Sequence, residues 1–218
     1  MKLRQFAAVL AVAIFPVAAR AADDENPYRK AKVGDFATYK MTTKIAGISA
    51  EGTLTQTVTA KDDKEATVTT SGKVVAMGME IPVREEKMTI DLTKPFDPGK
   101  VGNLPPGTEV KVEKLKDGTE KLKVGDKTYD SKWETFKMKA KLMGMEFEAE
   151  MKVWQAKELS IPMVKMEMAA DMGGQKMEVL MELTETGAKD LKKDEKAEDK
   201  KADKKEERKD EKKDVKKD

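Results

Sequence analysis

The chain has 218 residues, with 43 Lys and Arg against 41 Asp and Glu, and it contains neither histidine nor cysteine. The missing residues exclude the Ser-His-Asp arrangement, the usual base near neutral pH, and the familiar zinc and iron–sulfur sites. Without cysteine there are also no disulfide bonds and no lipidated cysteine of the bacterial lipoprotein type.

Residues 1–21 have the pattern of a secretory signal peptide. Lys2 and Arg4 precede an apolar run, and a small-residue cleavage site ends at Ala21. The run is shorter than the roughly 20 apolar residues that a membrane-spanning helix needs, and no other segment approaches that length. We therefore expect cleavage after Ala21 and a periplasmic or secreted protein that has no transmembrane segment and is not a lipoprotein.

The rest of the sequence divides into a domain and a tail. Removal of residues 1–21 leaves 40 basic and 41 acidic residues, so no nucleic-acid partner is expected. Residues 22–187 are long enough for one β-rich domain that is stabilised by burial alone. Residues 188–218 hold 13 Lys and one Arg against 12 Asp and Glu. We expect them to be a disordered or transiently helical tail, either a solubilising spacer or an electrostatic tether.

Period-two alternation decides the fold class, which we predict to be all-β. Between residues 145 and 153, for example, Met145, Phe147, Met151 and Val153 alternate with Glu and Lys residues. This pattern is typical of a strand with one dry and one wet face. We expect about ten strands in a curved antiparallel sheet, a half-barrel or flattened barrel. The expected strands are 33–45, 50–60, 65–77, 80–92, 109–115, 119–124, 127–142, 145–154, 163–170 and 176–184.

Turn signals separate these segments. Between Trp133 and Phe136 the apolar phase changes from odd to even positions, which predicts a β-bulge near Glu134 or Thr135. Residues 93–107 contain four prolines and form the longest expected loop, a candidate lid or a boundary between two halves of the domain. Four dipeptides lie between alternating runs and predict hairpins, namely Asp117-Gly118, Gly125-Asp126, Met143-Gly144 and Gly173-Gly174.

Methionine is the unusual feature of the composition, because ten of the 15 fall between Met138 and Met181. Methionine fills a core that is short of Leu and Ile, or it lines an adaptable apolar groove. A third interpretation is Cu(I) capture by the Met-x-Met segments at 77–79, 143–145 and 166–168. None of these segments is expected to be exposed. The candidate apolar ligand face consists of Phe136, Met138, Met145, Phe147, Met151, Met166, Met168, Met177 and Met181.

Two stretches also suggest a family. Val33–Tyr39 (VGDFATY) opens the domain, and Val153–Lys165 (VWQAKELSIPMVK) lies near its end. Both resemble uncharacterised exported bacterial proteins, common in planctomycetes, whose strands are similar to those of the LolA/LolB-like lipoprotein-carrier superfamily. The resemblance implies a curved antiparallel sheet around an apolar concavity that holds acyl chains, often with a helix as lid.

These features together predict a non-enzyme without cofactor or metal. Glycosidase-type catalysis needs paired carboxylates in a cleft lined by aromatic residues, and aromatic residues make up only 5% of the chain. We expect an exported binding or carrier module for an apolar small molecule, such as a lipid or acyl chain, or for a cell-envelope protein. The alternatives are a structural or interaction protein without a small ligand, and a methionine-based Cu(I) binder.

Overall fold

The computed structural model describes residues 26–94, 109–142, 145–172 and 174–191, and this part of the chain is all-β. Nine antiparallel strands form one sheet, and a short 3₁₀ helix, η1 (Pro27–Lys30), precedes them. The strands are β1 (Asp35–Ile45), β2 (Ile48–Lys61), β3 (Glu65–Ala76), β4 (Met79–Asp91), β5 (Glu109–Val124), β6 (Lys127–Leu142), β7 (Met145–Ala156), β8 (Met163–Met172) and β9 (Gln175–Ala188).

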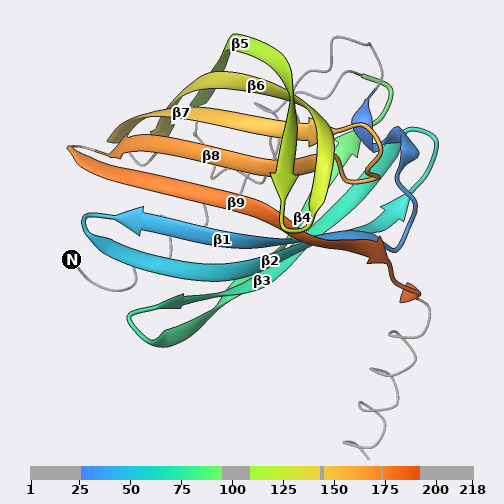
Figure 1. Ribbon diagram of the computed structural model, residues 1–218, viewed down its shortest axis with the longest axis horizontal. Coiled ribbons are helices and arrows are strands. Elements are labelled where there is room, and N and C mark those ends of the chain that lie inside the picture. The colour runs from blue at the N-terminus through green and yellow to red at the C-terminus, as the bar shows by residue number, and fades with distance from the viewer. Residues whose placement is uncertain (1–25, 95–108, 143–144, 173, 192–218) are drawn as a thin grey trace, which may run out of the picture.

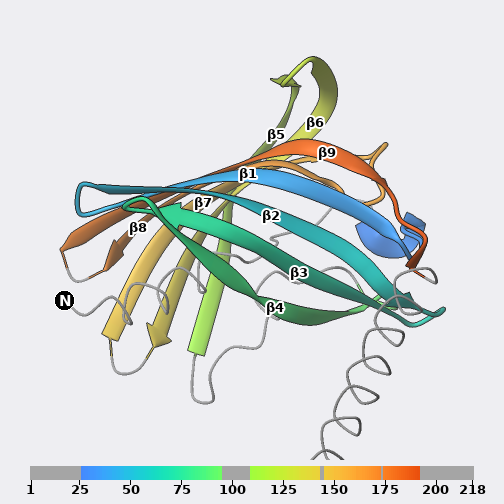
Figure 2. The same ribbon diagram turned by 90° about the horizontal axis from the view of Figure 1, so that it is seen from below.

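The sheet is open and strongly curved. Its strand order is β4-β3-β2-β1-β9-β8-β7-β6-β5, so two meanders, β1–β4 and β5–β9, join where β1 pairs with β9. Figures 1 and 2 show the sheet bent into an arch, with β1 and β9 along its crest. The edge strands β4 and β5 do not pair with each other. Pro82 on β4 and the many lysines on β5 make these edges poor partners for further strands.

Alternating side chains give the sheet an inner and an outer face. In β1, Ala37, Tyr39 and Met41 are buried on the inner side, whereas Thr38 and Lys40 lie on the outer side. Neighbouring strands are paired so that the apolar set of one meets the apolar set of the next. The inner sides of all the strands contribute to one hydrophobic core. The all-β prediction with one dry and one wet face is confirmed.

The helix η1 packs at one end of the inner face (Figure 1). Asn26 caps it, because its Oδ1 accepts a hydrogen bond from the Tyr28 N–H and its Nδ2 donates to the Asp91 carbonyl at 3.0 Å. Tyr28 and Tyr39 are both fully buried, and burial raises the pKa of each phenol well above its ordinary value. The Tyr39 hydroxyl donates to the Met163 carbonyl at 3.2 Å, which ties β1 to β8 across β9.

One predicted hairpin is wrong. Asp117-Gly118 lies inside β5, so the expected strands at 109–115 and 119–124 are a single strand. Gly118 pairs with Trp133 of β6, and a Cβ atom at position 118 would lie 2.7 Å from Cζ2 of the indole. The glycine is needed because the Trp133 ring covers it. In the sequence, a glycine of this kind has the same signature as a turn.

The bulge predicted near Glu134 or Thr135 lies on the neighbouring strand. The register between β5 and β6 shifts at Leu115 of β5, opposite Thr135 and Phe136. β6 itself pairs with β7 without interruption along this stretch. The position of the irregularity was therefore predicted correctly, but on the wrong strand.

The apolar positions in β6 change from odd to even for a different reason. Residues near the two ends of this strand are buried on opposite faces of the sheet. Phe136 and Met138 are buried on the inner face, whereas Tyr129 is buried on the outer face. Figure 2 shows this end of the β5–β6 hairpin standing away from the concave side of the sheet. Its outer side then contacts β7, where the Trp154 indole N–H donates to the Glu120 carboxylate.

The other described turns agree with the prediction. Gly125 and Gly174 have φ values of 59° and 86°, which glycine adopts without strain. In the β2–β3 turn, Asp62 accepts hydrogen bonds from the backbone N–H groups of Glu65 (2.7 Å) and Lys64 (2.8 Å), and these lower its pKa.

Several predictions fall outside the described residues. They concern the signal peptide within residues 1–25, the loop at 95–108, the turn at Met143-Gly144, and the tail from residue 192 onward. The start of the predicted tail is described and belongs to the sheet. β9 continues to Ala188, which pairs with Asp35, and the Lys189 N–H donates to the Gly34 carbonyl at 2.8 Å.

Candidate functional site

The inner face of β6–β9 is built from rows of side chains that run across the strands. Residues that pair across antiparallel strands point to the same face, so each row can be followed from the register. The three rows are Phe136–Met151–Met168–Val179, Glu134–Val153–Met166–Met181 and Met138–Ala149–Ala170–Met177. β1 extends them with Thr43, Met41 and Ile45, respectively.

The structure brings eight of the nine predicted site residues together on this inner face. Met145 is the first residue of β7, and its side chain lies outside the described part of the chain. The other eight are at most 9% exposed, and we call them the methionine face: Phe136, Met138, Phe147, Met151, Met166, Met168, Met177 and Met181. The structure shows that these eight side chains lie on the same inner side of the sheet. Their use as a ligand surface stays a prediction.

Curvature accounts for part of this burial. The apolar face of a sheet normally packs against a second layer. In the described ranges, no helix longer than η1 and no second sheet faces the methionine face. The arch instead brings the two sides of the same sheet toward each other (Figure 2), so that β1–β4 and β5–β9 share one core.

Polar atoms interrupt this apolar interior. Within the described chain, four buried side-chain atoms have no hydrogen-bond partner, namely Thr43 Oγ1, Gln56 Oε1, Glu134 Oε2 and Gln155 Nε2. In a dry, close-packed core each such atom costs about 1–3 kcal/mol. Native proteins keep only a few such atoms, and a buried water or a polar ligand group is one way to satisfy them.

Glu134 is the buried member of an ion network whose other members, Lys114, Lys132 and Asp117, reach solvent. Its side chain is 0% exposed, and its Oε1 accepts a hydrogen bond from Lys114 Nζ at 2.8 Å and lies 3.3 Å from Lys132 Nζ. Lys114 Nζ also lies 3.2 Å from Asp117 Oδ1. The hydrogen bond to Glu134 is the main cause that raises the pKa of Lys114. The second carboxylate oxygen, Oε2, takes no part in this network.

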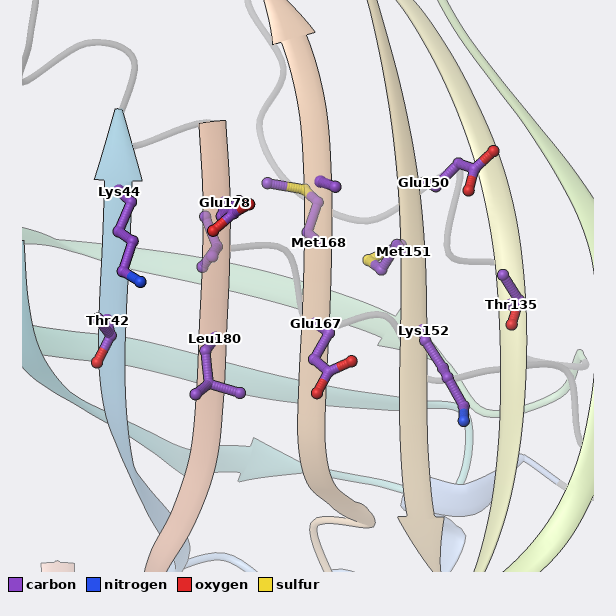
Figure 3. Close-up of a pocket in the computed structure, with 12 residues that line it drawn as sticks. Thr42, Lys44, Thr135, Glu150, Met151, Lys152, Glu167, Met168, Glu178 and Leu180 are labelled. Carbon is purple, nitrogen blue, oxygen red and sulfur yellow. The ribbon is translucent and has the colours of Figure 1, made fainter. Parts of the chain in front are cut away.

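The outer face behind the methionine face is polar. It carries cross-strand ion pairs, such as Lys139 with Glu148 at 2.6 Å, and the lysines on either side lower the pKa of Glu148. A shallow depression of about 480 Å³ lies over β1 and β6–β9. Figure 3 shows Lys44, Glu150, Lys152, Glu167 and Glu178 around it, with Leu180 as an apolar member. Met151, Met168, Ala169 and Val179 also line it, so its lining is both charged and apolar.

An aromatic cluster lies at one side of the outer face. Trp133 and Trp154 pair directly across β6 and β7, and Lys152 Nζ lies 4.3 Å from the ring centroid of each. Lys165 Nζ lies 5.3 Å from the Trp154 ring, and Glu120 accepts the indole hydrogen bond. Cation–π contacts of this kind fix both rings. Lysine already occupies the space between them, so the cluster holds the hairpin in place and leaves no open aromatic platform.

The Met-x-Met segments differ in exposure. Met166 and Met168 are buried on the methionine face. Met77 and Met79 are 69% and 46% exposed at the tip of the β3–β4 hairpin, where Met77 has a positive φ of 53°. The expectation that no Met-x-Met segment is exposed is therefore wrong for 77–79. Met77 lies in the turn and Met79 is the first residue of β4, so alternation along the strands does not determine their exposure.

The polar members of the inner face were not among the predicted site residues. Glu134 stands two residues before Phe136, so the alternation that places Phe136 and Met138 inside also places Glu134 there. That signal was present, but the predicted bulge at this position hid it. Gln155 follows Val153 in the same way. Nothing in the sequence pointed to Thr43 or Gln56 as unsatisfied, because their partners depend on the packing.

Neither a membrane-spanning helix nor a metal-binding cluster is present among the described residues. No helix among them is long and apolar enough to cross a membrane. No group of three or more His, Cys, Asp or Glu side chains in the same ranges is arranged to hold a metal ion.

Comparison with known proteins gives one distant neighbour. No protein-family profile matches the chain, and no curated protein matches it. Among solved structures, the chain is similar to a protein of Bacteroides fragilis that is described as exported and as having a YmcC-like fold. The TM-score is 0.44 and the identity is 9%. The match covers 75% of this chain and 99% of that chain. Likeness at this level says nothing of a ligand or an activity.

Proposed function

We propose that the protein is a non-catalytic, exported binding or carrier module that holds a lipid or another molecule with an acyl chain against the methionine face. The observation that supports this most is the character of the inner surface. It is continuous and apolar across β6–β9 and β1, yet it contains buried polar atoms without partners. A water molecule or a polar group of a ligand would satisfy those atoms.

Methionine suits this role better than it suits a tightly packed core. Its unbranched, polarizable side chain adapts to ligands of variable shape and specifies a single packing poorly. Six of the eight residues of the methionine face are methionines, and they come from four neighbouring strands. The resemblance to the LolA/LolB-like carriers, in which a curved sheet holds acyl chains, agrees with the proposal, as does the signal-peptide pattern of residues 1–21.

The test compares one inner and one outer substitution on the same strand. Met168 is 5% exposed on the inner side of β8, and its neighbour Ala169 is exposed on the outer side. Binding of the neutral fluorescent probe N-phenyl-1-naphthylamine is measured for the wild type, Met168→Asp and Ala169→Asp, with thermal unfolding of each. Ala169 pairs with Glu150 and Glu178, so the control carboxylate costs about 0.2–1 kcal/mol.

We expect the wild type and Ala169→Asp to bind the probe, and Met168→Asp to remain folded and lose binding. In a packed core, a buried carboxylate without a partner would unfold the domain instead. If the wild type binds no probe and Met168→Asp unfolds, the carrier proposal fails and the chain is a structural or interaction module. Native mass spectrometry of protein purified from its own host would then be expected to show no bound mass.

A further inference from the structure

The ligand of this face requires a place for its polar end, and β6 and β7 contain one. Glu134 and Gln155 are 0% and 8% exposed, and each leaves one polar atom without a partner. The atom on Glu134, Oε2, accepts hydrogen bonds, and the atom on Gln155, Nε2, donates them. An unpaired acceptor and an unpaired donor thus lie on neighbouring strands of the inner face.

The register places these two side chains close together. Glu134 pairs with Val153, and Gln155 is two residues further along β7, so the two are diagonal neighbours on one face. Diagonal neighbours on a sheet stand roughly 7–8 Å apart, which is within reach of long side chains. Lys132, which pairs directly with Gln155, completes the group. The two unpaired atoms are not bonded to each other, and a small polar group between them would satisfy both.

The charges of these side chains indicate which kind of ligand head group they accept. Oε1 of Glu134 is already held by Lys114 and Lys132, and Asp117 contacts Lys114. The two lysines are balanced by the two carboxylates, so a charged ligand group beside the buried side chains of Glu134 and Gln155 would add an unneutralised charge. A carboxylate head would also face Oε2 of Glu134. An ammonium head has no lone pair to accept from Gln155.

We infer that Glu134 and Gln155 recognise the head group of an amphiphile, and that this head is uncharged and carries a hydroxyl group. One hydroxyl donates its proton to Glu134 Oε2 and accepts a hydrogen bond from Gln155 Nε2, which satisfies both orphaned atoms at once. The acyl chain then lies along the methionine face, which begins at Phe136, two residues beyond Glu134. This inference rests on the proposed function and adds the class of head group to it.

The experiment displaces N-phenyl-1-naphthylamine with three ligands that share a twelve-carbon chain, namely 1-monolaurin, laurate and dodecylammonium. In the wild type at pH 8, monolaurin should displace the probe at a concentration at least about tenfold lower than either charged ligand, as expected for one to two hydrogen bonds in a buried site. Gln155→Met removes the donor and keeps the bulk, so it should lower the monolaurin preference about five- to tenfold and leave probe binding unchanged.

Two further variants sharpen the result. Glu134→Gln leaves Lys114 and Lys132 less compensated, so laurate should gain relative to monolaurin. Gln56→Met is the matched control, because Gln56 is also a buried glutamine with an unpaired atom but lies on β2, away from this group. It should leave the order of the three ligands unchanged.

The outcomes separate the two proposals. Equal displacement by the three ligands, or a monolaurin preference that survives Gln155→Met, overturns the head-group inference, while probe binding keeps the carrier proposal intact. If neither the probe nor any of the three ligands binds the wild type, both proposals fail. If Glu134→Gln does not fold, the wild-type order and Gln155→Met still decide the inference.

Discussion

Gly118 offers a direct test of the packing at the β5–β6 hairpin. An alanine Cβ at this position would lie 2.7, 2.8 and 3.0 Å from the Cζ2, Cε2 and Nε1 atoms of the Trp133 indole. Ordinary carbon contacts are about 3.5–4.0 Å, so the ring must move by roughly 1 Å. Lys152 and Gly118 lie against Trp133, which leaves the ring little freedom to move. We therefore expect Gly118→Ala to destabilise the domain.

The magnitude follows from two opposing terms. Overpacking costs about 1–3 kcal/mol, and replacing a strand glycine by alanine recovers about 0.5–1 kcal/mol of chain entropy. A net loss of roughly 1–2 kcal/mol corresponds to a fall in Tm of about 2–8 °C for a domain of this size. Thermal unfolding followed by circular dichroism measures it, and tryptophan fluorescence reports the displacement of the ring.

A double-mutant cycle with Trp133→Leu identifies the cause. With the indole removed, Gly118→Ala should be neutral or stabilising, so the two substitutions should couple by more than about 0.5 kcal/mol. If Gly118→Ala raises the Tm in the wild-type background, the ring does not cover the glycine, and the explanation for the missing turn is wrong.

Three further predictions concern other parts of the molecule. Hydrogen bonds from Lys94 and Thr93 lower the pKa of Asp91 from 3.8 to about 2, so their contribution to stability is present above about pH 4 and is lost as the pH falls toward 2. The difference in unfolding free energy between the wild type and Asp91→Asn, measured in urea, should therefore shrink over that range, and a constant difference would contradict this. Deletion of residues 192–218 should leave the Tm within about 1–2 °C of the wild-type value. Deletion from Ala188 onward should lower the Tm because it shortens β9. Equal Tm values for the two deletions would place the domain boundary elsewhere. Competition with a Cu(I) chelator should find no tighter binding than in a Met77→Leu/Met79→Leu variant, and a stoichiometric submicromolar complex that this variant lacks would support the copper alternative.

The local pattern of the chain was enough to predict its fold class. Alternation in segments such as Met145–Val153 shows that a strand has one dry and one wet side, because successive side chains in a strand point to opposite faces. The short turns predicted at Met143-Gly144 and Gly173-Gly174 make neighbours of the strands on either side of them, so the dry sides of each pair had to coincide. The methionine face followed from these two facts, although the pairing of β1 with β9 that closes the row did not.

The tertiary structure decided those features that the local sequence pattern left ambiguous. Gly118 has the signature of a turn, but it is a glycine because Trp133 lies over it. The phase change in β6 has the signature of a bulge, but it arises because Tyr129 and Phe136 are buried on opposite sides of one continuous strand. Alternation along a strand shows that one of its faces is buried, but it does not show which residues cover that face. That depends on the curvature of the whole sheet, and the packing it creates also decides that one oxygen of Glu134 is left unpaired.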